Sequence, residues 1–302
     1  MGEPKNSYNL NNIAAAAIFK DETFVSVAPF QPPSEDIETI SAEFHDAGVE
    51  ESLQLYGNEH SLAIKDDVPY ASYWQNEQKK FIFHPMVWGR YISNNLKTQP
   101  KLATRLNELT AKMGTKTPNG GIAFFYPNHY RLSRMCGPEL MYSCISQSEI
   151  LAGVLKAEKL YPELKVEQRT DAILKALFLE HEKGGVNLGV AQLELPLLHS
   201  NPEIILNGWL HSLFHLTDYA IYRNDKKVQR YVRTNLEFFL KYRDCWYDKK
   251  RFISKYSDTS PIRLIISGEA AEERNFGTLY KSRVPELPNY QFKPIIDFDE
   301  LY

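Results

Sequence analysis

One carboxylate lies in an unusually apolar stretch of the chain. Glu194 belongs to residues 192–196, with the sequence QLELP, directly before an expected helix. Burial raises the pKa of a carboxyl group, and a raised pKa lets that group exchange a proton with a substrate near neutral pH. Glu194 is therefore a candidate general base or acid. A glutamate that starts a helix or forms an ion pair has the same sequence setting, and for this residue alone that structural interpretation is favoured.

Aromatic rings and cations alternate in residues 129–134, with the sequence HYRLSR. Aromatic rings stack on the faces of sugars, and a guanidinium group pairs with a carboxylate through two parallel hydrogen bonds. The segment therefore offers candidate saccharide-binding residues, which are His129, Tyr130, Arg131 and Arg134. A solvated loop whose arginines form surface ion pairs explains the composition equally well.

A second basic segment places a phenol beside three cations. Tyr247 and Asp248 are followed by Lys249, Lys250 and Arg251. Nearby cations lower the pKa of a tyrosine and can neutralise a substrate carboxylate. A solvated basic turn is the commoner interpretation of such a charge run.

His211 and His215 stand four residues apart on an expected helix, a spacing that lets two side chains reach one metal ion. The glutamate of the HExxH motif is missing and the neighbouring residues are apolar, so core or interface histidines are the favoured interpretation. The three cysteines form no CxxC pair, and no glycine-rich nucleotide-binding motif is present. We expect no metal and no cofactor.

The overall composition is that of an ordinary globular protein. The 302 residues carry 35 Lys and Arg against 38 Asp and Glu, for a formal charge of -3, and 43% are hydrophobic. This charge balance gives no general attraction to nucleic acid or to an anionic membrane. No apolar run approaches the roughly 18 residues of a membrane span. We therefore expect a cytoplasmic protein with no nucleic-acid partner and no membrane span.

Helices must position these side chains, because apolar spacing and turn signals predict one helix after another from about residue 84 onward. The expected helices cover residues 86–96, 102–113, 138–160, 168–181, 202–222 and 226–242. Short turns favour helical hairpins packed side by side. We expect three parts, which are an irregular to mixed N-terminal segment (1–80), a mainly α domain (81–275) and an extended, proline-containing C-terminal tail (276–302).

Six segments between about residues 68 and 265 resemble, in chain order, motifs of the C-terminal domain of the D-glucuronyl C5-epimerases. These enzymes convert glucuronate to iduronate in heparan sulfate and related polymers. The segments are HPMVWGRY (84–91, similar to P-V-x-I-A-Q-Y), NGGI (119–122, x-G-G-W), YSCISQS (142–148, W-Y-S-A-M-A-Q-G), ELP (194–196, E-Y-P), ILNGWLHSL (205–213, V-L-N-G-F-M-Y-S-L) and WYD (246–248, I-Y-D-L-R).

The resemblance implies a fold and a set of site residues. Residues 81–275 would form a partial (α/α) toroid of helical hairpins, with a groove for a uronic-acid polymer, and the protein would be a homodimer. Glu194 matches the family's catalytic glutamate and Tyr247 one catalytic tyrosine. The arginine that binds the substrate carboxylate falls at Lys250 or Arg251. The matched segments also supply groove or scaffold positions, which are Tyr142, Gln147 and Asn207.

Two departures from the family pattern affect the expected chemistry. Leu195 replaces the tyrosine of E-Y-P, and residues 260–264 (SPIRL) contain no counterpart of the family's second catalytic tyrosine. Tyr256 is the tyrosine nearest in sequence and is our candidate for that role. The acid on the opposite face of the sugar ring therefore has no firm assignment.

The sequence is compatible with three functions. The first is C5 epimerisation of uronic-acid residues in a polysaccharide or oligosaccharide, in which one group removes the C5 proton and another returns a proton to the opposite face. The second is a polysaccharide lyase, which shares the proton abstraction but then eliminates the substituent at C4. The third is a carbohydrate-binding module without catalytic activity, because fold and function separate readily. We expect the epimerase.

Overall fold

The computed structural model describes residues 50–55, 58–65, 68–75, 78–126, 142–194, 204–242, 247–248 and 253–254. Its N-terminal unit is a four-stranded antiparallel sheet in the order β1-β2-β3-β4. The strands are β1 (Glu50–Leu55), β2 (Asn58–Lys65), β3 (Val68–Gln75) and β4 (Gln78–Ile82). Two residues separate each pair of neighbouring strands, which is the commonest length of a tight hairpin loop. Our interpretation of residues 1–80 as irregular to mixed did not identify this sheet.

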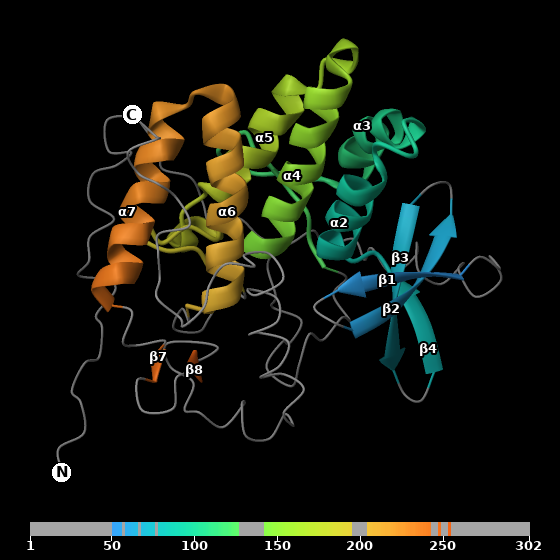
Figure 1. Cartoon of the computed structure of the whole chain (residues 1–302), viewed down its shortest axis with the longest axis horizontal. Helices are drawn as coiled ribbons and strands as arrows, with labels where there is room; N and C mark the ends of the chain where they lie inside the picture. The colour runs from blue at the N-terminus through green and yellow to red at the C-terminus, as the bar shows by residue number, and fades with distance from the viewer. Residues whose placement is uncertain are drawn as a thin grey trace, which may run out of the picture.

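The sheet packs beside the first helix of the described chain. Leu62, Ala71 and Ile82 occupy paired register positions on three strands, and all three side chains are buried. Strand β3 contacts α2 (Pro85–Asn95), and β4 leads into α2 through two residues (Figure 1). The second of these, His84, begins α2, because its Nδ1 accepts a hydrogen bond from Val87 N (3.5 Å) and proline follows at the first helical position.

The rest of the described chain is mainly helical, as expected. After α2 come α3 (Lys101–Met113), α4 (Cys144–Leu160), α5 (Glu167–Leu177), α6 (Leu206–Arg223) and α7 (Lys226–Tyr242). Two short 3-10 turns are η2 (Pro162–Leu164) and η3 (His181–Lys183), and two small hairpins pair β5 (Thr115–Lys116) with β6 (Ile122–Ala123) and β7 (Tyr247–Asp248) with β8 (Ile253–Ser254). None of the described helices is long and apolar enough to cross a membrane.

Helices α2, α4 and α6 lie side by side and run in the same direction. Residue numbers increase along both α2 and α4 from one contact to the next. Gly89 lies against Glu149, and Ser93, one turn later in α2, lies near Gly153, one turn later in α4. The approach is close, because a Cβ at Gly89 would lie 2.6 Å from the main-chain carbon of Glu149. Glu149 contacts His211 early in α6, and Glu158, near the carboxyl end of α4, contacts Arg223 at the carboxyl end of α6. Figure 1 shows the three helices. The amino-terminal ends of the three helices therefore lie on one side of the molecule.

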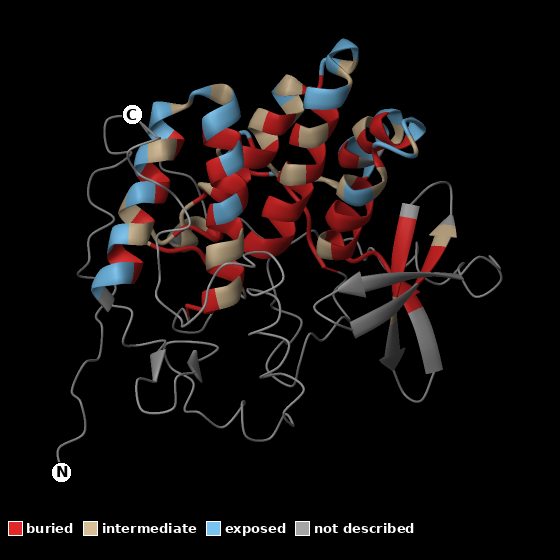
Figure 2. Ribbon diagram, in the orientation of Figure 1, coloured by how far each residue is buried: buried red, intermediate tan, exposed pale blue. Residues whose placement is uncertain are grey.

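Helices α5 and α7 pack antiparallel to α4 and α6. Thr170 of α5 bonds to Glu158 late in α4, and Ile173 O accepts from Gln147 near the start of α4. Trp209 at the start of α6 donates to Asn235 Oδ1 of α7. Large apolar side chains fill the space between the helices, and Figure 2 shows their inward faces as buried.

Most expected helices are present, with shifted boundaries. Helix α7 has the expected bounds, and α3 begins one residue early. Helix α5 ends at Leu177 rather than His181, because Phe178 N and Leu179 N bond to carbonyls three residues back and the chain then turns into η3. The expected start of α4 at residue 138 lies outside the described residues, and residues 142–143 are extended or irregular and precede the first helical turn. Helix α6 starts at Leu206 rather than 202, since Ile205 is extended.

Candidate functional site

Glu194 lies against the first turn of α6. The residue before it, Leu193, is fixed by two main-chain hydrogen bonds. Leu193 O accepts from Cys144 N (3.1 Å), and Leu193 N donates to Val186 O (2.8 Å). A Cβ at Gly208 would clash with Glu194 Oε2 and lie 2.6 Å from the Cβ of Glu194. Glycine at position 208 therefore lets the glutamate approach the helix backbone. The amino end of a helix carries partial positive charge, which favours an ionised carboxylate there.

Other polar groups gather where α4 and α6 begin. Asn207 Oδ1 and Ser143 Oγ are buried and have no hydrogen-bond partner among the described residues. Cys144 is fully buried, and burial, followed by the nearby charge of Glu194, raises the pKa of its thiol well above the usual value. A carboxylate, an amide oxygen and a hydroxyl at the same end of two parallel helices form a polar region within an apolar body.

Tyr142 and Gln147 serve as scaffold in the described structure. The buried Tyr142 hydroxyl donates to Ala176 O (2.7 Å), and burial raises the pKa of this phenol. The Gln147 side chain accepts from Phe124 N (3.2 Å) and donates to Ile122 O and Ile173 O. Both side chains thus tie α4 to main-chain groups of α5 or of the β6 region. The scaffold role, which the resemblance implied beside a groove role, fits these contacts.

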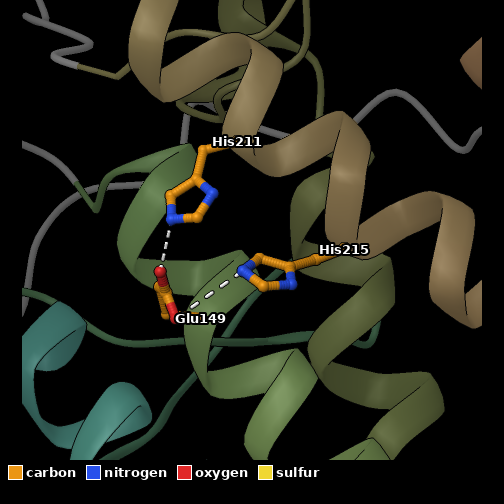
Figure 3. A group of neighbouring side chains, drawn as sticks. All are labelled: Glu149, His211 and His215. Atoms are coloured by element: carbon orange, nitrogen blue, oxygen red, sulfur yellow. Dashed lines mark ion pairs between the residues drawn. The ribbon is translucent and has the colours of Figure 1, made fainter. Parts of the chain in front are cut away.

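A charged cluster joins α2, α4 and α6, and we call it the Glu149 cluster. It consists of Arg90, Glu149, His211 and His215 (Figure 3 shows Glu149 and the two histidines). Arg90 Nε donates to Glu149 Oε1 (2.7 Å), and His211 Nε2 lies 2.6 Å from the same oxygen. His215 Nε2 is 3.6 Å from Glu149 Oε2. Arg90 Nη2 lies 2.5 Å from His211 Nε2, so Arg90, Glu149 and His211 all contact one another.

Burial and neighbouring side chains together shift the pKa values of His211 and Glu149. Burial, with the charges of His215 and Arg90, lowers the pKa of His211 to about 4, although Glu149 opposes this shift. His211 is therefore neutral at pH 7. Burial alone would raise the pKa of Glu149, but the two histidines hold it well below its usual range. Glu149 is ionised, and the Arg90 guanidinium balances its charge.

The remaining predicted site residues lie mostly outside the described residues. They are His129, Tyr130, Arg131, Arg134, Lys250, Arg251 and Tyr256. Tyr247 is described only as part of strand β7. Among the described candidates, the structure brings Glu194 together with the Asn207-Gly208 turn.

Arg90 and Glu149 are site residues that sequence reasoning missed. Each is a single charged residue in an apolar stretch of helix, in the segments MVWGRYI and CISQSEIL. Such a charge must find a partner when it is buried, and this is the signal that identifies the pair. The histidines were expected to be core or interface residues. They are largely buried, and their rings face a carboxylate rather than apolar side chains alone.

Comparisons of the chain with protein-family models, with curated proteins and with solved structures gave no match.

Proposed function

We propose that the protein is a C5-epimerase that acts on uronic-acid residues of a polysaccharide or oligosaccharide, with Glu194 as the base. The observation that carries the proposal is the position of Glu194 against Gly208 at the amino end of α6. Glu194 and Gly208 each belong to a segment, ELP and NGW, that resembles a motif of the family. The parallel helices α2, α4 and α6, with α5 and α7 antiparallel to them, are compatible with the hairpins of a partial (α/α) toroid.

The chemistry matches this position. The base takes the proton from C5, and the electron pair of the broken C–H bond moves into the adjacent carboxylate. Positive groups must then hold the developing negative charge. The amino ends of α4 and α6 supply partial charge of this sign. Lys250 and Arg251 are the proposed carboxylate ligands, and Tyr247 or Tyr256 returns a proton to the opposite face, which gives the epimer with no net change in composition.

Isotope exchange tests the proposal directly. The protein is incubated with glucuronate-containing oligosaccharides in D₂O, and NMR follows deuterium at C5 and the iduronate signals. We expect both to appear, and Glu194→Gln to abolish both. Glu163→Gln, in an exposed turn, is the matched control and should keep wild-type rates. Full exchange in Glu194→Gln would remove Glu194 from the mechanism.

Two further outcomes separate the alternative functions. An unsaturated product that absorbs in the near ultraviolet identifies a lyase. Saturable binding of the oligosaccharides without deuterium uptake identifies a binding module.

A further inference from the structure

Two imidazoles and one carboxylate converge on a single point between α4 and α6. One ligand atom from each of Glu149, His211 and His215 lies within 4.8 Å of the other two. Two ligand atoms on one tetrahedral zinc ion lie about 3.4 Å apart, because each is about 2.1 Å from the metal. The distance of 3.6 Å between Glu149 Oε2 and His215 Nε2 already matches this spacing. His211 Nε2 is closer to the carboxylate, at 2.6 Å from Glu149 Oε1, so these two side chains must move apart to admit an ion.

His215 is a buried polar side chain with unused bonding capacity. Its side chain is 10% exposed, and neither ring nitrogen has a hydrogen-bond partner in the part of the chain that the structure describes. A buried imidazole without hydrogen bonds costs free energy. Figure 3 shows both rings directed from α6 toward Glu149 on α4. An imidazole nitrogen that makes no hydrogen bond can serve as a ligand atom for a metal ion.

We propose that Glu149, His211 and His215 bind one divalent transition-metal ion of the zinc class. Two imidazoles and one carboxylate form a common three-ligand zinc set, and they leave a fourth position for water or another ligand. The ion replaces the contact between His211 and Glu149 Oε1, and Arg90 stays on that oxygen as an outer partner that orients the carboxylate. Metal binding at this cluster does not depend on the proposed epimerase activity.

Arg90 controls the affinity of the site. Its guanidinium carries a positive charge within hydrogen-bond distance of two of the ligands, so it repels an incoming cation. We therefore expect a moderate affinity in the natural protein. Arg90→Met removes the repulsion and leaves Glu149 without its balancing charge, so this variant binds the ion at least about tenfold more tightly.

Metal binding to the full chain tests the proposal. Chelator-treated protein is dialysed against Zn²⁺, and metal analysis counts the ions per chain. Co²⁺ serves as a spectroscopic probe. We expect the Co²⁺-loaded protein to absorb visible light as strongly as other four- or five-coordinate Co²⁺ sites with nitrogen and oxygen ligands. Failure of Zn²⁺ and Co²⁺ to bind stoichiometrically, up to millimolar free metal, would overturn the proposal.

Matched variants locate the ion. His215→Gln is expected to lower the affinity at least about tenfold, whereas His181→Gln, which lies outside the cluster, keeps it. Equal affinity of His215→Gln and wild type would place the ion elsewhere, and so would unchanged affinity in Arg90→Met. Circular dichroism verifies that each variant is folded.

If a variant does not fold, NMR of the natural protein still locates the ion, because the ring signals of its histidines can be followed as Zn²⁺ is added. Of the eight histidines in the chain, only the two rings of the cluster should shift when Zn²⁺ is added. A response from other histidines, with these two unchanged, contradicts the assignment.

Discussion

The contact between α4 and α6 holds one buried glutamate near each end, and the two glutamates have different surroundings. Glu149, near the amino end of α4, belongs to the cluster with Arg90 and the two histidines. Glu158, near the other end, accepts from Thr170 Oγ1 (2.8 Å) and from Arg223 Nη2 (2.9 Å). Both carboxylates are almost fully buried, with 4% and 3% of their side chains exposed.

The difference lies in the partners. Arg223 is 25% exposed and also lies near Asp171, so water and a second carboxylate share its charge. One buried nitrogen of this group, Arg223 Nε, lacks a partner among the described residues, but a guanidinium N–H is only a donor and binds no cation. The imidazoles beside Glu149 offer lone pairs instead. The Glu158–Arg223 ion pair thus offers no lone pair on nitrogen to a metal ion. The imidazoles of the Glu149 cluster do, which is why we propose the metal site at that end alone.

The largest expected effect is the loss of the buried carboxylate at position 149. Glu149→Leu removes the carboxylate that lies 2.7 Å from Arg90 Nε, so a buried ion pair is broken while the guanidinium stays charged. This should destabilise the protein by about 3–5 kcal/mol. Urea unfolding of the variant and of wild type measures the change. Adding Arg90→Met to Glu149→Leu should restore most of the stability. A loss below about 1 kcal/mol in the single variant would show that Arg90 has another partner of equal strength.

The free energy of unfolding should fall as the pH drops from 6.5 to about 4, because His211 of the Glu149 cluster has a lowered pKa. His211 has a pKa of about 4 in the folded state and about 6.5 when unfolded, so only the unfolded chain gains this proton between those values. Stability is complete above pH 6.5 and falls by up to about 3 kcal/mol as the pH drops to 4. The lowered pKa of Glu149 adds a further loss below its unfolded value, with the same sign.

Urea unfolding measures this loss of stability. It is carried out with a chelator at about pH 7.0, 5.5 and 4.5, which roughly span the interval between the folded and unfolded pKa values of His211. His211→Gln has no titrating ring at this position, so its stability should change less over the same interval. The same slope in both proteins would assign the decline to other groups.

A smaller effect is expected at the other end of the contact. Glu158→Leu removes one of two acceptors of Thr170 and the closer carboxylate of Arg223. Thr170 keeps Val166 O, and Arg223 keeps Asp171 and access to water. We expect a loss of about 1–2 kcal/mol by urea unfolding. A loss as large as that of Glu149→Leu would mean that the two ends do not differ energetically.

The smallest effect is expected at His215. His215→Leu removes a buried imidazole that makes no hydrogen bond to the described residues, but it also removes the favourable interaction of that ring with Glu149. The two effects oppose each other, so the stability of the metal-free protein should change by about 1 kcal/mol or less, in either direction. Zn²⁺ should raise the melting temperature of wild type and leave that of His215→Leu unchanged. Equal stabilisation of both proteins by Zn²⁺ would contradict the role of this ring.

Local sequence signals predicted the helices well and the charged contacts poorly. Apolar spacing and turn residues located α3 and α7 closely, because these features depend on neighbours within a few residues. The sheet of β1 to β4 was missed, since its short strands depend on pairing between segments rather than on a strong local pattern.

The same contrast holds for the candidate site. Glu194 and Gly208 belong to two segments that resemble motifs of one family, and the resemblance gave no distance between them; their approach was found only in the structure. The Glu149 cluster draws residues from three helices, and Arg90 and Glu149 are 59 positions apart in the sequence. No spacing rule links such residues until the packing of α2, α4 and α6 is known.

The close approach of α2 and α4 also has a mechanical consequence. Because main-chain atoms meet at Gly89, these two helices cannot slide without breaking the contact, and they behave as one rigid block. Helix α6 contacts α4 through side chains such as those of Glu149 and Glu158, so we expect α6 to shift more readily than α2 does against α4. Amide protons of α2 and α4 should then exchange with solvent only when the whole protein unfolds, whereas those at the start of α6 exchange through smaller openings.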